Sequence, residues 1–283
     1  HMTANIRHYK ARQLANTMWA VAKLGHTPSQ TWLNACTTAA MRQTASYEPQ
    51  HLANTLYAFG LRPRWLEGGK SRQQLLSKLL AESHSKLGSF KPQELSNLLW
   101  AAAQLHAAKL LPFEAATSHV LQAAVEAAGR RARELNSQEA CNTMWAAARL
   151  CNQPGLTSQQ QQHPLQPGSS GQQQSRRKGA AGSAAASPAQ QRAPIATPPP
   201  EWVTAMLQQV EVTCEELQPA GLGALLLALG WLGARPQRAW ISDLMVVSAE
   251  VMQSAAPHDL SSMALGLAYL GYEPQRWWSQ LWY

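Results

Sequence analysis

The sequence is poor in charge, in cysteine and in long apolar runs. Charged residues make up only 14% of the 283 positions, and there are 4 cysteines. The cysteines form no CxxC pair, which argues against a disulfide framework or a zinc site and favours isolated thiols in a reducing compartment. No apolar run reaches the roughly 18 residues that a transmembrane helix needs, so we expect no membrane span.

Motifs that carry catalysis or bind metals are also missing. The chain has no phosphate-binding glycine loop, no nucleophile elbow and, among its 9 histidines, no HExxH pair. Its 16 acidic residues are spread thinly along the chain. We therefore expect this protein not to be an enzyme, and we expect neither a cofactor nor a metal site.

Basic residues outnumber acidic ones, 24 to 16, for a net charge of +8. Four of the basic residues and no acid lie between Gly155 and Pro200, so the rest of the chain carries about +4. This mild excess favours a polyanionic partner, nucleic acid before an anionic membrane, without establishing either. The chain starts with His1 and Met2, which we interpret as an expression remnant, so we expect no targeting segment in it.

The dominant feature of the sequence is an internal repeat. Asn16–Leu24 reads NTMWAVAKL and recurs almost unchanged, as NTMWAAARL, at Asn142–Leu150. Looser or degenerate copies stand at Asn54–Gly60, Asn97–Leu105, Leu222–Gly233 and Leu260–Gly271. The period is 38 residues from Leu14 to Leu52 and from Leu222 to Leu260, whereas the steps between Leu52, Leu95 and Ala140 are 43 and 45 residues, which loop or helix extensions would explain. Repeats with a period of this size are typical of helical solenoids.

Each unit predicts two helices. The first, such as Gln13–Leu24, is rich in Ala, Leu and Met, and Gly25 and Pro28 supply an ordinary helix stop after it. The second begins near a tryptophan that follows a proline, as in Trp202–Leu217 and Trp240–Gln253. Neither helix can bury its apolar stripe alone, so neighbouring pairs must stack. The fold class is therefore all-α: a solenoid, or α-superhelix, of about five to six helix-turn-helix repeats of roughly 38 residues.

One segment departs from the repeat. Residues 155–197 consist mainly of Gln, Ser, Gly, Ala and Pro, a composition that predicts disorder. Pro154 corresponds to Pro28 of the first unit, and Pro198–Trp202 supplies the expected start of a second helix. We therefore predict repeats one to three and the first helix of repeat four over residues 1–154. An insertion in the turn of repeat four would cover 155–197, and the rest of repeat four, repeat five and a partial sixth would cover 198–283.

Two motifs in these units resemble the octotricopeptide repeat family. They are NTMWAxAxLG at Asn16–Gly25 and PPPEW at Pro198–Trp202. The resemblance covers most of the chain outside the insertion, although repeats five and six lack the Asn and carry Leu227 and Leu265 in place of the first-helix Trp. Members of that family are largely green-algal, nucleus-encoded proteins of chloroplasts or mitochondria. They bind particular organellar transcripts and promote their stability, processing, splicing or translation.

The resemblance implies an organellar α-superhelix that binds single-stranded RNA selectively, either a transcript or ribosomal RNA, and possible membership of a ribonucleoprotein complex. The alternative is a structural or protein-binding scaffold, such as an organellar ribosome component that clamps ribosomal RNA or a neighbouring subunit. A protein-binding array should carry an apolar or acidic stripe. The stripe described next is rich in amides and mildly basic, which favours RNA.

A helical wheel places that stripe on the first helices. When each helix is numbered from its leucine as zero, positions 0, 4 and 7 form the apolar side and positions −2, 2, 5 and 9 gather opposite. Amides there could read base edges, and cations could meet phosphates. The candidate RNA-binding residues are Arg12, Asn16, Lys23, Gln50, Asn54, Gln93, Asn97, Gln104, Gln138, Asn142, Arg149 and His258. The aromatic residues at position 5, which either stack on bases or are structural, are Trp19, Tyr57, Trp100 and Trp145.

The recurrence of the Asn and the Trp indicates packing, because residues that read different bases should differ between repeats. We therefore interpret positions 2 and 5 as structural and the variable positions −2 and 9 as the better candidates for contact. Two further basic clusters, Arg62 with Arg64 in a turn and Arg130–Arg133 late in a second helix, are more typical of solvated surface.

Overall fold

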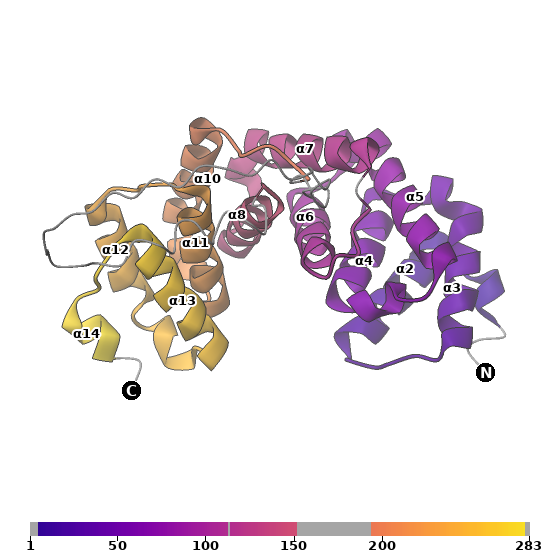
Figure 1. The fold of residues 1–283 in the computed structure, drawn as a ribbon, viewed down its shortest axis with the longest axis horizontal. Helices are drawn as coiled ribbons and strands as arrows, with labels where there is room; N and C mark the ends of the chain where they lie inside the picture. The colour runs from indigo at the N-terminus through magenta and orange to yellow at the C-terminus, as the bar shows by residue number, and fades with distance from the viewer. Residues whose placement is uncertain (1–4, 113, 152–193, 281–283) are drawn as a thin grey trace, which may run out of the picture.

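The computed structural model describes residues 5–112, 114–151 and 194–280. Throughout these ranges the regular elements are helices, either α-helices or short 3-10 turns, and no strand is present. The α-helices follow one another as antiparallel pairs, and the pairs stack into an arch (Figure 1). This arrangement confirms the predicted all-α, solenoid-like fold.

The first helix of each pair belongs to an inner layer, in which every helix packs against the next. Its members are α2 (Ala11–Lys23), α4 (Pro49–Leu61), α6 (Pro92–Ala107), α8 (Ser137–Cys151), α11 (Pro219–Leu232) and α13 (Pro257–Leu270). In Figure 1, α4, α6, α8 and α11 lie within the arch, whereas α7 runs along its outer edge. Leucines at position zero, such as Leu14, Leu52 and Leu95, are completely buried between the layers.

The second helices form the outer layer. They are α3 (Gln30–Gln43), α5 (Lys70–Lys86), α7 (Ala115–Arg130), α10 (Pro200–Val212), α12 (Arg238–Ser248) and the short α14 (Arg276–Ser279). Most tryptophans that follow the prolines fill the space beneath this layer: Trp32, Trp65, Trp202 and Trp278 are buried, and Trp240 is half-buried. The rings of Trp32 and Trp65, from successive pairs, meet edge to face with centroids 6.1 Å apart. These tryptophans are therefore core residues that join one pair to the next.

A common junction connects each pair to the following one. A 3-10 turn is followed by one extended residue, whose side chain is buried at Tyr47, Phe90, Leu135 and Leu217. The backbone N–H before the inner helix then donates to the side chain of the third helical residue. This bond runs from Lys10 to Gln13 Oε1 (3.0 Å), from Lys91 to Glu94 Oε2 (2.7 Å) and from Ala256 to Asp259 Oδ2 (3.0 Å). Such bonds satisfy a backbone donor that a helix start leaves open.

Some predicted boundaries were wrong. The helices α10 and α12 end at Val212 and Ser248, earlier than expected, and 3-10 turns over 214–216 and 251–254 follow them. Trp65 lies in a 3-10 turn, and α5 begins only at Lys70, because Gly68 with φ +68° interrupts the chain between them. The basic cluster Arg130–Arg133 was predicted to lie late in a second helix. In the structure, Arg131 and Arg133 lie beyond the end of α7.

The fourth pair consists of α8 and α10. Most of the predicted insertion, 155–193, lies outside the described residues. Its last part does not: Ile195 is buried, and the Ala196 N–H donates to Gln122 Oε1 on α7 at 3.1 Å. The end of the predicted insertion therefore contacts α7, and Ile195 gives it an apolar side chain to bury. Beyond them, α10 contacts α7 and α8.

Candidate nucleic-acid interface

The open side of the inner layer, hereafter the inner face, consists of the side chains at positions −2, 2, 5 and 9 of the six inner helices. The apolar side of the same helices is buried, as Leu14 and Met18 of α2 show with exposed fractions of 0% and 1%. None of the predicted RNA-contacting or aromatic residues is buried; each is half-buried or exposed. All sixteen side chains are thus accessible, at positions that the helical wheel places on one side of the inner helices.

The inner face carries cations but no carboxylate. Its positively charged side chains are Arg12, Lys23 and Arg149. The acidic residues within the inner helices, Glu94, Glu139 and Asp259, stand at position −1, where each accepts a backbone N–H at its helix start. A polyanion on this surface would therefore meet net attraction, although at α13 the Asp259 carboxylate lies 3.1 Å from His258 Nε2.

Amide side chains adjoin one another on this face. Asn54 Nδ2 donates to Asn16 Oδ1 of the preceding pair at 3.3 Å, and Gln138 Nε2 donates to Asn142 Oδ1 at 2.9 Å. Each of these bonds uses one donor or acceptor of an amide that has several. The remaining groups are free to read the edges of unpaired bases.

A first cluster of aromatic and basic side chains spans pairs one to three. The Nζ of Lys23 lies 5.9 Å from the Trp19 ring centroid and 5.5 Å from that of Tyr57. The Tyr57 ring in turn lies against Trp100, with centroids 4.7 Å apart and planes tilted by 30°. Trp19 is the most open of these rings, with 37% of its surface exposed.

A second cluster joins pairs four and five. The guanidinium carbon of Arg149 lies 5.4 Å from the Trp145 ring centroid and 5.7 Å from that of Trp231. Burial lowers the pKa of Arg149, although an arginine still keeps its charge. Trp231 was not among the predicted candidates. The sequence does place it at position 9, one of the variable positions favoured for contact. Only the stacking of α8 on α11 shows which cation it meets.

Positions 2 and 5 combine packing with partial exposure. Trp100 and Trp145 are half-buried and pack against the hydrophobic core, whereas 37% of the Trp19 surface is exposed. The buried tryptophans belong to the outer layer instead, as at Trp32 and Trp202. Trp19 is therefore a surface residue with contact potential, whereas Trp100 and Trp145 also contribute to packing.

The other basic clusters are occupied within the fold. Arg62 Nε donates to the Ala22 carbonyl at 3.0 Å, which ties the second pair to the end of α2. Arg131 donates to the Phe90 carbonyl and forms an ion pair with Glu134 at 2.6 Å. These cations contribute to junctions between pairs and are less available to a ligand than those of the inner face.

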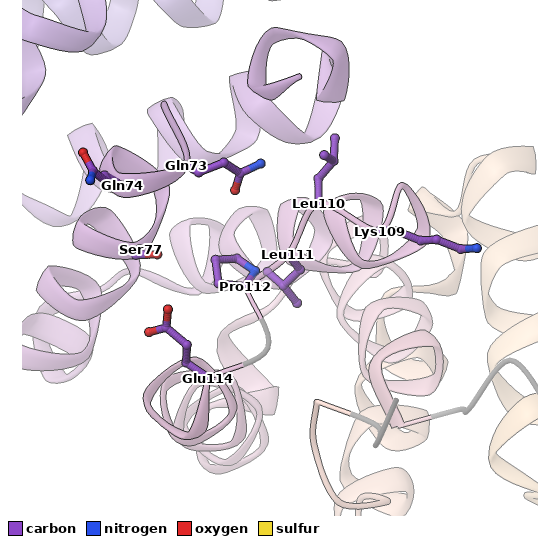
Figure 2. A pocket seen from close by; sticks show the side chains of 8 residues that line it. All are labelled: Gln73, Gln74, Ser77, Lys109, Leu110, Leu111, Pro112 and Glu114. Atoms are coloured by element: carbon purple, nitrogen blue, oxygen red, sulfur yellow. The ribbon is translucent and has the colours of Figure 1, made fainter. Parts of the chain in front are cut away.

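An open pocket of about 380 Å³ lies on the outer layer. Figure 2 shows residues that line it: Gln73, Gln74 and Ser77 of α5, Pro112 in the loop that carries Lys109, and Glu114 near the start of α7. Its two charged residues have opposite signs, so it offers a polyanion no net attraction. Elsewhere in the described ranges no three potential metal ligands gather, and no described helix is both long and apolar enough to cross a bilayer.

Comparison with known proteins places these residues in a family. No curated protein matches the sequence. The family model described as Tbc2 translation factor, N-terminal domain, matches residues 1–161, more than half of the chain. The match covers the first three helix pairs and α8, and with them most of the inner face. The chain therefore belongs to the Tbc2 translation factor N-terminal domain family.

Proposed function

We propose that this protein binds single-stranded RNA along its inner face and acts, without catalytic activity of its own, in the translation of an organellar transcript. The observation that carries the proposal is the inner face itself: amides, aromatic rings and cations at equivalent positions of stacked helices, with no carboxylate among them. The family name supports a role in translation. The resemblance of Asn16–Gly25 and Pro198–Trp202 to octotricopeptide repeats supports an organellar RNA as the partner.

The chemistry of the face favours single strands over duplexes. Bases must be unpaired before rings such as Trp19 can stack on them or amides can reach their Watson–Crick edges. Contacts to phosphate depend on Arg12, Lys23 and Arg149, so the affinity should fall as salt rises. Selectivity between sequences then depends on the amides at positions −2 and 2, which differ in their bonding from pair to pair.

The test compares two triple variants with the same change in charge. One replaces Arg12, Lys23 and Arg149 by Gln; the other replaces the exposed outer-layer residues Arg42, Arg64 and Lys70. Binding of labelled single-stranded and duplex RNA is followed by fluorescence anisotropy over a range of salt. We expect the inner-face variant to lose affinity and to reduce the salt slope by about 2, at roughly 0.7 for each phosphate contact. The outer-layer variant should behave much more like the parent.

Two outcomes would contradict the proposal. Equal losses in both variants would show that only overall charge matters. A folded parent protein that ignores single-stranded RNA at low salt would end the RNA interpretation, and the scaffold function would then account for the inner face.

A further inference from the structure

We propose that the two cation–aromatic clusters of the inner face have different tasks: Arg149, held between Trp145 and Trp231, binds an RNA phosphate, whereas Trp19 stacks on a base. The inference rests on the proposed RNA-binding function and deepens it by assigning a chemical contact to each cluster. It also adds Trp231, at the junction of the fourth and fifth pairs, to the residues that shape the site.

The surroundings of Arg149 leave its charge uncompensated. Its guanidinium carbon lies over two indole rings, 5.4 Å from the Trp145 centroid and 5.7 Å from the Trp231 centroid. Among the described residues no carboxylate comes within ion-pair distance of it, and its buried Nε–H has no hydrogen-bond acceptor. A guanidinium held by aromatic rings keeps its N–H groups for other acceptors, and their forked arrangement matches two oxygens of a phosphate.

The titratable neighbour of Arg149 does not supply a counter-charge either. Burial lowers the pKa of His106 on α6, and the positive charge of Arg149 lowers it further. His106 is therefore neutral near pH 7, and it can neither neutralise Arg149 nor repel an anion that approaches it. A half-buried cation without a negative partner is unusual, because removing a charge from water is costly unless an anion compensates it. A bound phosphate would provide that compensation.

The cluster around Trp19 has the opposite arrangement. Trp19 is 37% exposed, and the cation that contacts it among the described residues is the exposed side chain of Lys23, with Nζ 5.9 Å away. A lysine on a long stem can move aside or follow a phosphate, which leaves the indole face open to a base. The Trp145 and Trp231 rings, by contrast, already share Arg149. Trp231 is thus a positioning residue for the guanidinium, and Trp19 is a stacking platform.

The experiment separates the two tasks with homopolymeric RNA. Affinities for single-stranded oligo(U) and oligo(A) are measured over a salt series for the parent, R149Q, R149K and W19L, with melting curves as a check of folding. R149Q should weaken both oligomers by the same factor, about tenfold for a lost charge-assisted hydrogen bond. It should also lower the salt slope by about 0.7, whereas R149K should restore the slope but not the full affinity.

W19L should leave the salt slope unchanged and weaken oligo(A) more than oligo(U), because purines stack more strongly on an aromatic ring. A positioning variant, W231L, should weaken both oligomers equally while the charge of Arg149 remains. The inference is overturned if R149Q leaves the salt slope unchanged or if W19L affects both oligomers alike. Failure of the parent to bind either oligomer would instead refute the proposed function, so the two failures are distinguishable.

Discussion

The indole Nε1 of Trp202 donates a 2.8 Å hydrogen bond to the backbone carbonyl of Val125, 77 positions earlier in the chain. This bond fastens α10 to α7, and Gln209 fastens the same helix to the Leu135 carbonyl. Gly129 makes room for the ring, since a Cβ there would come within 2.2 Å of Trp202 Cδ1. The outer layer therefore continues from α7 to α10, and the stack of pairs is one array on both sides of residues 152–193.

Replacement of residues 155–193 by a short flexible linker should leave this array intact. The Trp202–Val125 hydrogen bond that seats α10 on α7 joins residues outside the deleted stretch, and a shorter loop costs slightly less entropy to close. We expect one cooperative melt at the parent's temperature, followed by circular dichroism. A longer deletion, through Thr197, should be less stable by about 1.5–3 kcal/mol because it also removes the buried Ile195. Two separate melting transitions in the shorter deletion would contradict the single array.

Contacts within the inner layer are tight enough to require glycine at specific positions. A Cβ added to Gly60 of α4 would lie 2.7 Å from the Ala101 Cα of α6, a backbone atom that cannot move aside. Gly60→Ala should therefore destabilise the protein by about 1–3 kcal/mol through overpacking. The matched control is Gly88→Ala, where nothing lies within 4 Å of the added methyl group. Urea denaturation measures both; equal effects would show that the two inner helices can separate without cost.

Much of this fold could be predicted from the sequence because the repeat is expressed in local signals. The period, the glycine and proline stops and the apolar stripe each act within one or two turns of helix, so a single copy suffices to identify them. The exceptions have equally local causes: Gly68 delays the start of α5, and Ile195 gives an otherwise polar stretch one residue to bury.

The inner face was harder to interpret because exposure depends on the neighbouring pairs. A helical wheel placed Asn16 and Trp19 on one side but could not show whether the next pair covers them. In the structure, α4 packs beside α2 instead of over this side, and Trp19 remains accessible. The pairing of Arg149 with Trp231 depends likewise on how α8 stacks on α11. The predicted insertion separates these helices in the sequence, so residue spacing cannot show which positions of the two helices meet.

At the ends of two inner helices, a substitution to glycine and a substitution to alanine should change the stability in opposite directions. Gly25 follows α2 with φ +73°, and Lys109 occupies the equivalent position after α6 with φ +59°, where a side chain is strained. Lys109→Gly should raise the stability by up to about 1 kcal/mol, while Gly25→Ala should lower it by about 1–2 kcal/mol. Thermal melts of both variants test the pair. A loss of stability in Lys109→Gly would mean that contacts of the lysine outweigh its backbone strain.

The start of α4 predicts a pH dependence of stability. His51 Nδ1 accepts the Glu48 backbone N–H at 3.2 Å, which requires an unprotonated nitrogen. Burial lowers the pKa of His51 below its ordinary value of 6.5, and this effect exceeds those of the nearby charges. The unfolded chain thus takes up the proton first. The contribution of neutral His51 to folding stability is fully present above about pH 6.5. It declines as the pH falls from there towards the lowered pKa of the folded state.

His51→Gln should remove part of this decline without removing the helix start. Gln13 occupies the equivalent position in the first pair and accepts the Lys10 N–H at 3.0 Å, so an amide fits the bond at any pH. We expect the variant to match the parent near pH 8 and to be more stable than it at pH 5, with a residual slope from His106, whose pKa is also lowered. Gln13→Ala, the control, should lower stability by the same amount at both pH values. Denaturant midpoints from pH 5 to 8 decide the matter: if the parent and His51→Gln have parallel profiles, protonation of His51 does not break the bond at the start of α4.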